Sequence, residues 1–174
     1  MYFPTLSTMS RFQIDEFLYN KLDIWLGTRR KAVRNFLSPI QFSLDCEIDQ
    51  ETSISLFVIC TEKDINLLKQ RYVVECPCCQ RLLGEYLAPA DIPFIIDCPE
   101  CGKNIKVNRD MIVIWFKLTQ EPLTQPYQIN IDMSLMVRES VGKDISLRPE
   151  HIEASENPMV RRLFSGYNER LRSS

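Results

Sequence analysis

Four cysteines are arranged in two Cys-x-x-Cys pairs whose spacing is typical of a metal site. Cys76 and Cys79 form the first pair, Cys98 and Cys101 form the second, and 18 residues separate the pairs. A Cys-x-x-Cys turn aims both sulfurs at one point, and two such turns supply the four thiolates of a closed tetrahedral zinc site. The sequence therefore predicts one structural Zn²⁺. Four thiolates also suit iron, which stays the alternative metal.

The residues around each pair favour tight turns. Pro77 and Pro99 follow the first cysteine of each pair, where a fixed φ suits the first turn position. Gly102 follows the second pair and can adopt a positive φ as the chain turns back, whereas Gln80 stands at the equivalent place after the first pair. We therefore expect the first turn to be the less regular of the two.

Cys-Pro-x-Cys, then 18 residues, then Cys-Pro-x-Cys-Gly-Lys, with β-rich sequence on either side, resembles the zinc ribbons built from two rubredoxin-type knuckles. The resemblance covers roughly residues 72–118 and implies a structural metal and a local β fold. It implies no single activity, because zinc ribbons occur in transcription factors, polymerase subunits, ribosomal proteins, chaperones and assembly adaptors.

The chain has seven cysteines, an odd number that argues against a disulfide framework. Cys78 lies inside the first pair and is a spare thiol that could be a bystander, an alternate metal ligand or an oxidation-sensitive group. Cys46 and Cys60 lie in apolar runs and are expected to be core residues.

Composition is that of a globular chain that is soluble and cytoplasmic. At 174 residues and 45% hydrophobic content, the chain can bury a substantial core. No run approaches the about 18 apolar residues of a membrane span, and the N-terminus lacks a basic region followed by an apolar run. Abundant free thiols favour a reducing compartment. The net charge of −2 is not a nucleic-acid-binding signature for the chain as a whole.

The pattern of apolar residues predicts an α+β fold with N-terminal helices, an antiparallel sheet continuous with the ribbon, and a C-terminal amphipathic helix. In the first 71 residues Ser10 is expected to cap the first helix. The elements expected there are helices at 11–25 and 28–37, strands at 40–48 and 53–60, and a helix at 61–70 capped by Thr61.

In the remainder, a strand at 72–75 is expected to lead into the metal site, and a strand at 111–118 is apolar on both faces and must be covered on both sides. Asn157 and Pro158 predict the start of the terminal helix. The other expected strands are 81–87, 94–97, 103–107 and 128–137. Three segments follow: 1–71, the ribbon at 72–118, and 119–174, the last packed as one domain with 1–71.

Four basic residues on the expected helix 28–37 raise the alternative of nucleic-acid binding, although such a face is more often a solvated surface. These residues are Arg29, Arg30, Lys31 and Arg34.

Catalysis is not expected. His151 is the one histidine, the five glycines are scattered, and a closed four-thiolate site has no position for an activated water. The sequence favours a non-catalytic zinc-binding adaptor or regulatory subunit that acts through a protein partner, with no membrane and no small-molecule substrate. Nucleic-acid binding is the first alternative, and a thiol redox sensor that releases zinc, with Cys78 as the spare thiol, is the second.

Overall fold

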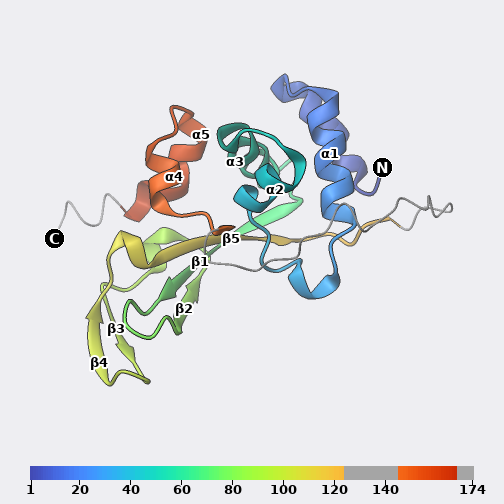
Figure 1. Cartoon of the computed structure of the whole chain (residues 1–174). Helices are drawn as coiled ribbons and strands as arrows, with labels where there is room; N and C mark the ends of the chain where they lie inside the picture. The colour runs from blue at the N-terminus through green and yellow to red at the C-terminus, as the bar shows by residue number, and fades with distance from the viewer. Residues whose placement is uncertain (124–144, 168–174) are drawn as a thin grey trace. The chain divides into compact units, whose positions relative to one another are not determined.

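A computed structural model of the chain describes residues 1–123 and 145–167, and Figure 1 labels its helices and strands. The architecture is α+β, with helices near the N-terminus, antiparallel strands in the middle and helical segments near the C-terminus, which confirms the predicted class. The chain forms two compact units. The first contains Met1–Lys69 and the described residues from Phe116 to Ile145, and the second contains Gln70–Trp115 and the described residues from Ser146 on.

This grouping reflects contacts between residues and not independent folding. The predicted segments 1–71, 72–118 and 119–174 therefore stay a prediction. No helix among residues 1–123 and 145–167 has the length and apolar character needed to cross a membrane.

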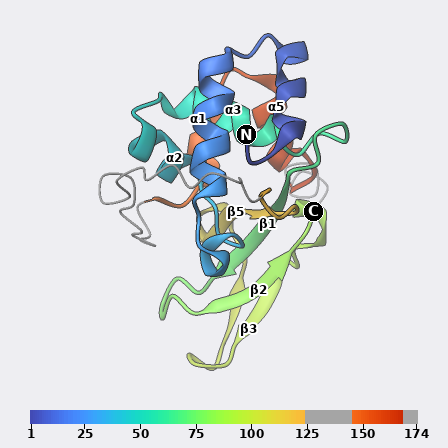
Figure 2. The same ribbon diagram turned by 90° about the vertical axis from the view of Figure 1, so that its right-hand side faces the viewer.

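The first unit begins with a 3₁₀ helix, η1 (Pro4–Phe12), which lies alongside the helix α1 (Glu16–Gly27), as Figure 2 shows. The predicted helix is present but starts later than expected. Asp15 is its N-cap, and its carboxylate accepts a hydrogen bond of 2.7 Å from the backbone N–H of Phe17. Ser10 belongs to η1 instead.

The two predicted strands of the first unit are wrong, because both segments are helices. They are α2 (Pro39–Cys46) and α3 (Gln50–Ile59). Ser38 caps α2 with Pro39 at the first helical position, and the Asp49 carboxylate accepts from the Thr52 backbone N–H at the start of α3.

Burial explains why the helical period is hidden. In α2 the five consecutive residues from Pro39 to Ser43 are buried, and in α3 Ser53, Ile54 and the four residues from Leu56 to Ile59 are buried. A helix enclosed in this way shows no amphipathic stripe. The alternation of apolar and polar residues in the sequence therefore looked like that of a strand.

Two other predicted helices are also wrong. The segment 28–37 contains a short 3₁₀ turn, η2 (Lys31–Val33), and the segment 61–70 is a turn followed by the start of strand β1 (Leu68–Glu75). Neither segment forms enough consecutive turns to offset the cost of helix nucleation.

Aromatic rings form the centre of the first unit. Trp25 of α1 lies edge-on to Phe42 of α2 and Phe57 of α3, with ring centroids 5.3 and 5.9 Å apart, and Phe57 lies 5.2 Å from Phe116. Such edge-to-face pairs add to the stabilisation from burial alone.

The N-terminal residues are attached to α1 by a buried carboxylate. Asp23 is buried, and its two oxygens accept hydrogen bonds of 2.7 Å from the backbone N–H groups of Tyr2 and Phe3. Tyr2 then covers Gly27, since a Cβ built on Gly27 would lie 2.3 Å from the Tyr2 ring. A side chain at position 27 is excluded while Tyr2 holds this position.

The second unit contains the predicted ribbon strands. β1 pairs antiparallel with β2 (Leu82–Tyr86), from Tyr72 opposite Tyr86 to Glu75 opposite Leu82. β3 (Ile95–Cys98) pairs antiparallel with β4 (Lys103–Lys106), and β5 (Ile112–Leu118) joins the sheet in the order β2-β1-β5. β5 is buried on both faces except at Lys117, as its composition predicted.

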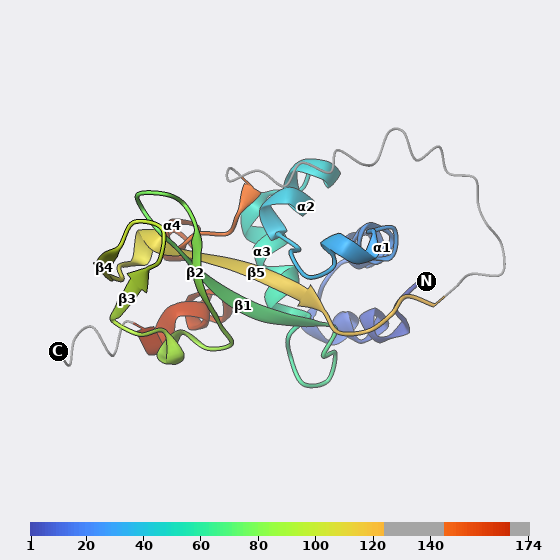
Figure 3. The same ribbon diagram turned by 90° about the horizontal axis from the view of Figure 1, so that it is seen from below.

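The C-terminal helices also belong to the second unit, and Figure 3 shows them beside its strands. These are α4 (Pro149–Glu153), α5 (Pro158–Arg161) and the 3₁₀ turn η7 (Arg162–Phe164). Asn157 caps α5 as predicted, its side chain accepting from the Met159 backbone N–H at 2.9 Å. The Tyr72 hydroxyl of β1 donates to the carbonyl of Leu163 at 2.7 Å.

The predicted strand 128–137 lies outside the described residues, as does the end of the predicted terminal helix beyond residue 167.

The contact between Tyr2 and Gly27 predicts whether replacing Gly27 raises or lowers the free energy of unfolding. Gly27→Ala should lower the free energy of unfolding by about 1–3 kcal/mol, because the new methyl group must displace the Tyr2 ring. In a Tyr2→Ala background the same change should be neutral or stabilising, since alanine favours a helix over glycine by up to about 1 kcal/mol. Denaturant unfolding of the four variants of this cycle measures the effect.

Gly166→Ala is the matched control. A Cβ there would lie 3.7 Å from the Cβ of Ala90, an ordinary contact, so no loss of stability is expected. Equal effects of Gly27→Ala with and without Tyr2 would contradict this account.

Candidate metal centre

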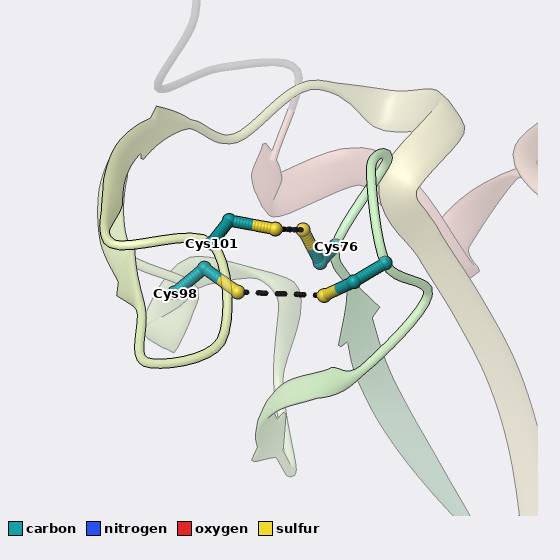
Figure 4. Close-up of side chains that lie close together, drawn as sticks. Cys76, Cys98 and Cys101 are labelled. Carbon is teal, nitrogen blue, oxygen red and sulfur yellow. Dashed lines mark hydrogen bonds between the residues drawn. The ribbon is translucent and has the colours of Figure 1, made fainter.

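The four predicted cysteines converge in the second unit. Each offers one Sγ, and these four sulfur atoms all lie within 4.8 Å of one another. Two Sγ–Sγ pairs join the knuckles and are dashed in Figure 4: Cys76 and Cys101 are 3.8 Å apart, and Cys79 and Cys98 are 3.6 Å apart. The grouping supports a metal-binding module.

These distances fit a tetrahedral metal ion. Zinc–sulfur bonds of about 2.3 Å place the corners of a tetrahedron about 3.8 Å apart. The two measured separations agree with that value, and both exceed the about 2.05 Å of a disulfide bond. No histidine or carboxylate among the described residues joins the group. A metal bound here would have four thiolate ligands and no open position.

The first knuckle follows directly from β1. The backbone N–H of Cys76 donates to the carbonyl of Arg81 at 2.8 Å, and the N–H of Gln80 donates to the carbonyl of Cys76 at 2.9 Å. Gln80 has φ of 62°, the left-handed region. The register also shifts between Val74 and Glu75, just before the knuckle. The chain is therefore less regular where it enters the first knuckle, as predicted, and the left-handed conformation of the non-glycine residue Gln80 costs about 1–2 kcal/mol.

The second knuckle joins β3 to β4 with equivalent geometry. Cys98 lies opposite Lys103, five residues on, just as Cys76 lies against Arg81. The N–H of Gly102 donates to the carbonyl of Cys98 at 2.8 Å, and Gly102 has φ of 62° with no steric conflict in that conformation. Matching turns therefore present both sulfur pairs to one point.

Electrostatics of the sulfur cluster favour binding of a cation. Backbone N–H groups of Cys79 and then Cys78 donate to the sulfur of Cys76 and lower the pKa of that thiol to about 6. The sulfur of Cys79, burial and the sulfur of Cys76 raise the pKa of Cys101 to about 12. Repulsion between neighbouring thiolates thus opposes full deprotonation, and a divalent cation would remove that opposition.

The two sides of the cluster differ in exposure. Cys76 and Cys98 are each 1% exposed, Cys101 is half-buried, and Cys79 is exposed. Cys78 is exposed as well, but its sulfur is not part of the group of four. Its role as an alternate ligand stays a prediction.

The four basic residues of the nucleic-acid hypothesis are not one solvent-exposed row. Arg29 is 6% exposed, donates to the Asp45 carboxylate at 2.7 Å and stacks on the Trp25 ring at 3.9 Å. Arg34 forms an ion pair with Glu121. Arg30 and Lys31 are exposed. A nucleic-acid role for these four residues stays a prediction.

His151 has a structural contact. Its Nδ1 accepts a hydrogen bond of 3.0 Å from the backbone N–H of Arg148, the N-cap residue of α4.

The first unit contains a pocket of about 240 Å³ that sequence reasoning missed. It lies between one face of α1 and the end of α2, and its lining residues are Lys21, Ile24, Trp25, Thr28, Asp45, Cys46 and Glu47. Lys21, Ile24, Trp25 and Thr28 are three or four residues apart, the spacing of one helix face, but no signal showed that α2 would be a helix ending beside them.

Loss of one ligand should reduce metal content and stability together. Cys98→Ser or Cys101→Ser should lower bound zinc and the melting temperature, since a structural zinc site contributes on the order of 10 kcal/mol to folding. Elemental analysis and thermal unfolding check this. Cys78→Ser is the matched control and should keep full metal. Stoichiometric metal in both ligand variants would contradict the proposed ligand set.

Metal affinity should fall as the pH is lowered. The metal-bound state holds fewer protons than the metal-free state, because Cys101 and its neighbours must lose protons to become ligands. The zinc dissociation constant should therefore rise steadily between about pH 8 and about pH 6 in a competition titration with a chelator. An affinity that does not change with pH would indicate that thiols are not the ligands.

No protein-family model, no curated protein and no solved structure matches this chain. The four-sulfur cluster is accordingly the main evidence for the function of this chain.

Proposed function

We propose that this chain is a non-catalytic, cytoplasmic zinc-binding adaptor or regulatory subunit, whose two knuckles form a zinc ribbon around one structural Zn²⁺. The observation that carries this proposal is the closed set of four sulfurs, within 4.8 Å of one another, at the tips of two matching turns. A metal held by four thiolates stabilises the fold and leaves no site for an activated water.

Exposed apolar side chains on the ribbon support a protein partner. Leu82, Leu87 and Ile95 are 51%, 71% and 56% exposed, and all three lie between the two knuckles. Leu82 is on β2 and Ile95 on β3, two strands that lie near each other. Exposed large apolar residues on neighbouring strands are a candidate interaction site.

Charge supports protein binding over nucleic-acid binding. Arg29 and Arg34 already contact carboxylates of the chain, so two of the four basic residues are neutralised locally. Phosphate binding depends on several unneutralised cations acting together.

A ribbon-surface variant should lose the partner. In affinity purification of the full chain with nuclease present, a protein should copurify with wild type but not with Leu82→Ser/Leu87→Ser/Ile95→Ser. The matched control is Phe17→Ser/Leu44→Ser, which removes exposed apolar side chains from the first unit and should keep the partner. Metal analysis of each variant checks that the ribbon is intact.

Equal recovery by the ribbon-surface variant would contradict the proposed surface. Recovery that depends on nucleic acid, and that falls when Arg30 and Lys31 are neutralised, would favour the nucleic-acid alternative.

A further inference from the structure

One pair of sulfurs in the cluster combines exposure with close approach. Cys79 is exposed, and its Sγ lies 3.6 Å from the Sγ of Cys98 on the other knuckle. Cys98 is buried, so an oxidant from solvent meets Cys79 first.

We propose that Cys79 and Cys98 are the site of a reversible disulfide, formed by hydrogen peroxide, that expels the bound metal. The inference rests on the proposed zinc site and assigns a regulatory modification to it. The pair combines an exposed thiol with a buried one whose sulfur is 3.6 Å away.

Competing pairings are less favourable. Cys76 and Cys101 are 3.8 Å apart, but Cys76 is buried and Cys101 only half-exposed. Cys78 and Cys79 are adjacent, and neighbouring Cα atoms about 3.8 Å apart are closer than the about 4.4 Å minimum usual for a disulfide. Closing the bond between Cys79 and Cys98 shortens their separation by about 1.5 Å, which side-chain rotation at two turn tips can supply.

The chemistry balances with one peroxide. The Cys79 sulfur attacks peroxide, the O–O bond breaks, and the sulfur becomes a sulfenic acid while one oxygen leaves and takes a proton to form water. The Cys98 thiolate attacks the oxidised sulfur, so the S–S bond forms, the S–O bond breaks and the second oxygen leaves as water. Two thiolates, one peroxide and two protons give one disulfide and two waters. Cys79 and Cys98 would then no longer be thiolate ligands, so a zinc ion held by the four cysteines would lose two ligands and be released without a change of oxidation state.

The backbone around the site keeps the sulfurs in range when the metal leaves. Pairing of β1 with β2 forms the base of the first knuckle, and pairing of β3 with β4 forms the base of the second. Arg81 and Glu100 form an ion pair from one knuckle to the other. None of these contacts uses a sulfur atom, so reduction can restore the site.

The test is a peroxide titration of the zinc-loaded full chain. Released zinc is followed with a chromogenic chelator, and disulfides are mapped by mass spectrometry after alkylation. We expect one zinc released per chain, a Cys79–Cys98 linkage, and recovery of the zinc after addition of dithiothreitol. Cys78→Ser should release zinc as readily as wild type. Cys60, which is fully buried, should stay reduced as an internal control.

Other results would distinguish failure of the zinc site from failure of the disulfide switch. A chain that contains no zinc before peroxide is added would overturn both the zinc site and the switch. A chain that holds its zinc until it unfolds, that links other cysteines, or that requires Cys78 for release would overturn the switch and leave the zinc site standing.

Discussion

Repulsion among four sulfurs at one point is the constraint on which the two knuckles of the second unit depend. Two turns bring the four sulfur atoms within 4.8 Å of one another. The sulfur of Cys79 and burial raise the pKa of Cys101, whereas backbone N–H groups lower the pKa of Cys76. A divalent cation converts that repulsion into four bonds. The knuckles can be short and partly exposed because the metal, and not a hydrophobic core of their own, would hold them together.

The four-cysteine cluster was predictable because its signal is local. A tight turn needs a fixed φ at Pro77 and Pro99 and a positive φ after the second cysteine, and each requirement falls on a residue within the motif. The strands around it followed from the same local pattern. Even the departure at Gln80 was visible in the sequence, and the structure accommodates it with a left-handed residue and a shifted register nearby.

The first unit was harder to predict because its helices are enclosed. Alternation from Ile40 to Ile48 favoured a strand, but Ser38 followed by Pro39 was the stronger indication of a helix start, since a cap depends on the backbone and not on burial. The wrong strand assignment also prevented prediction of the contacts that Asp45 makes. This carboxylate, at the end of α2, accepts hydrogen bonds from Trp25 and Arg29 of the preceding segment, contacts that cannot be inferred while α2 is taken as a strand. The local pattern of apolar and polar residues does not predict long-range contacts of this kind.

Loss of the metal need not unfold the second unit, because part of its core is independent of the cysteines. Tyr72 is buried, its ring lies edge-on to Phe164 at 6.0 Å, and its hydroxyl donates to the carbonyl of Leu163. Tyr167 in turn donates to the carbonyl of Val107 at 3.3 Å. Burial raises the pKa of Tyr72, so its hydroxyl stays protonated and the hydrogen bond persists across the physiological range. These contacts attach β1 and Val107, which follows β4, to the C-terminal helical segments without involving a sulfur. A unit built in this way can change locally at the knuckles while its aromatic core remains packed, which is the physical condition for a metal site that responds reversibly to its surroundings.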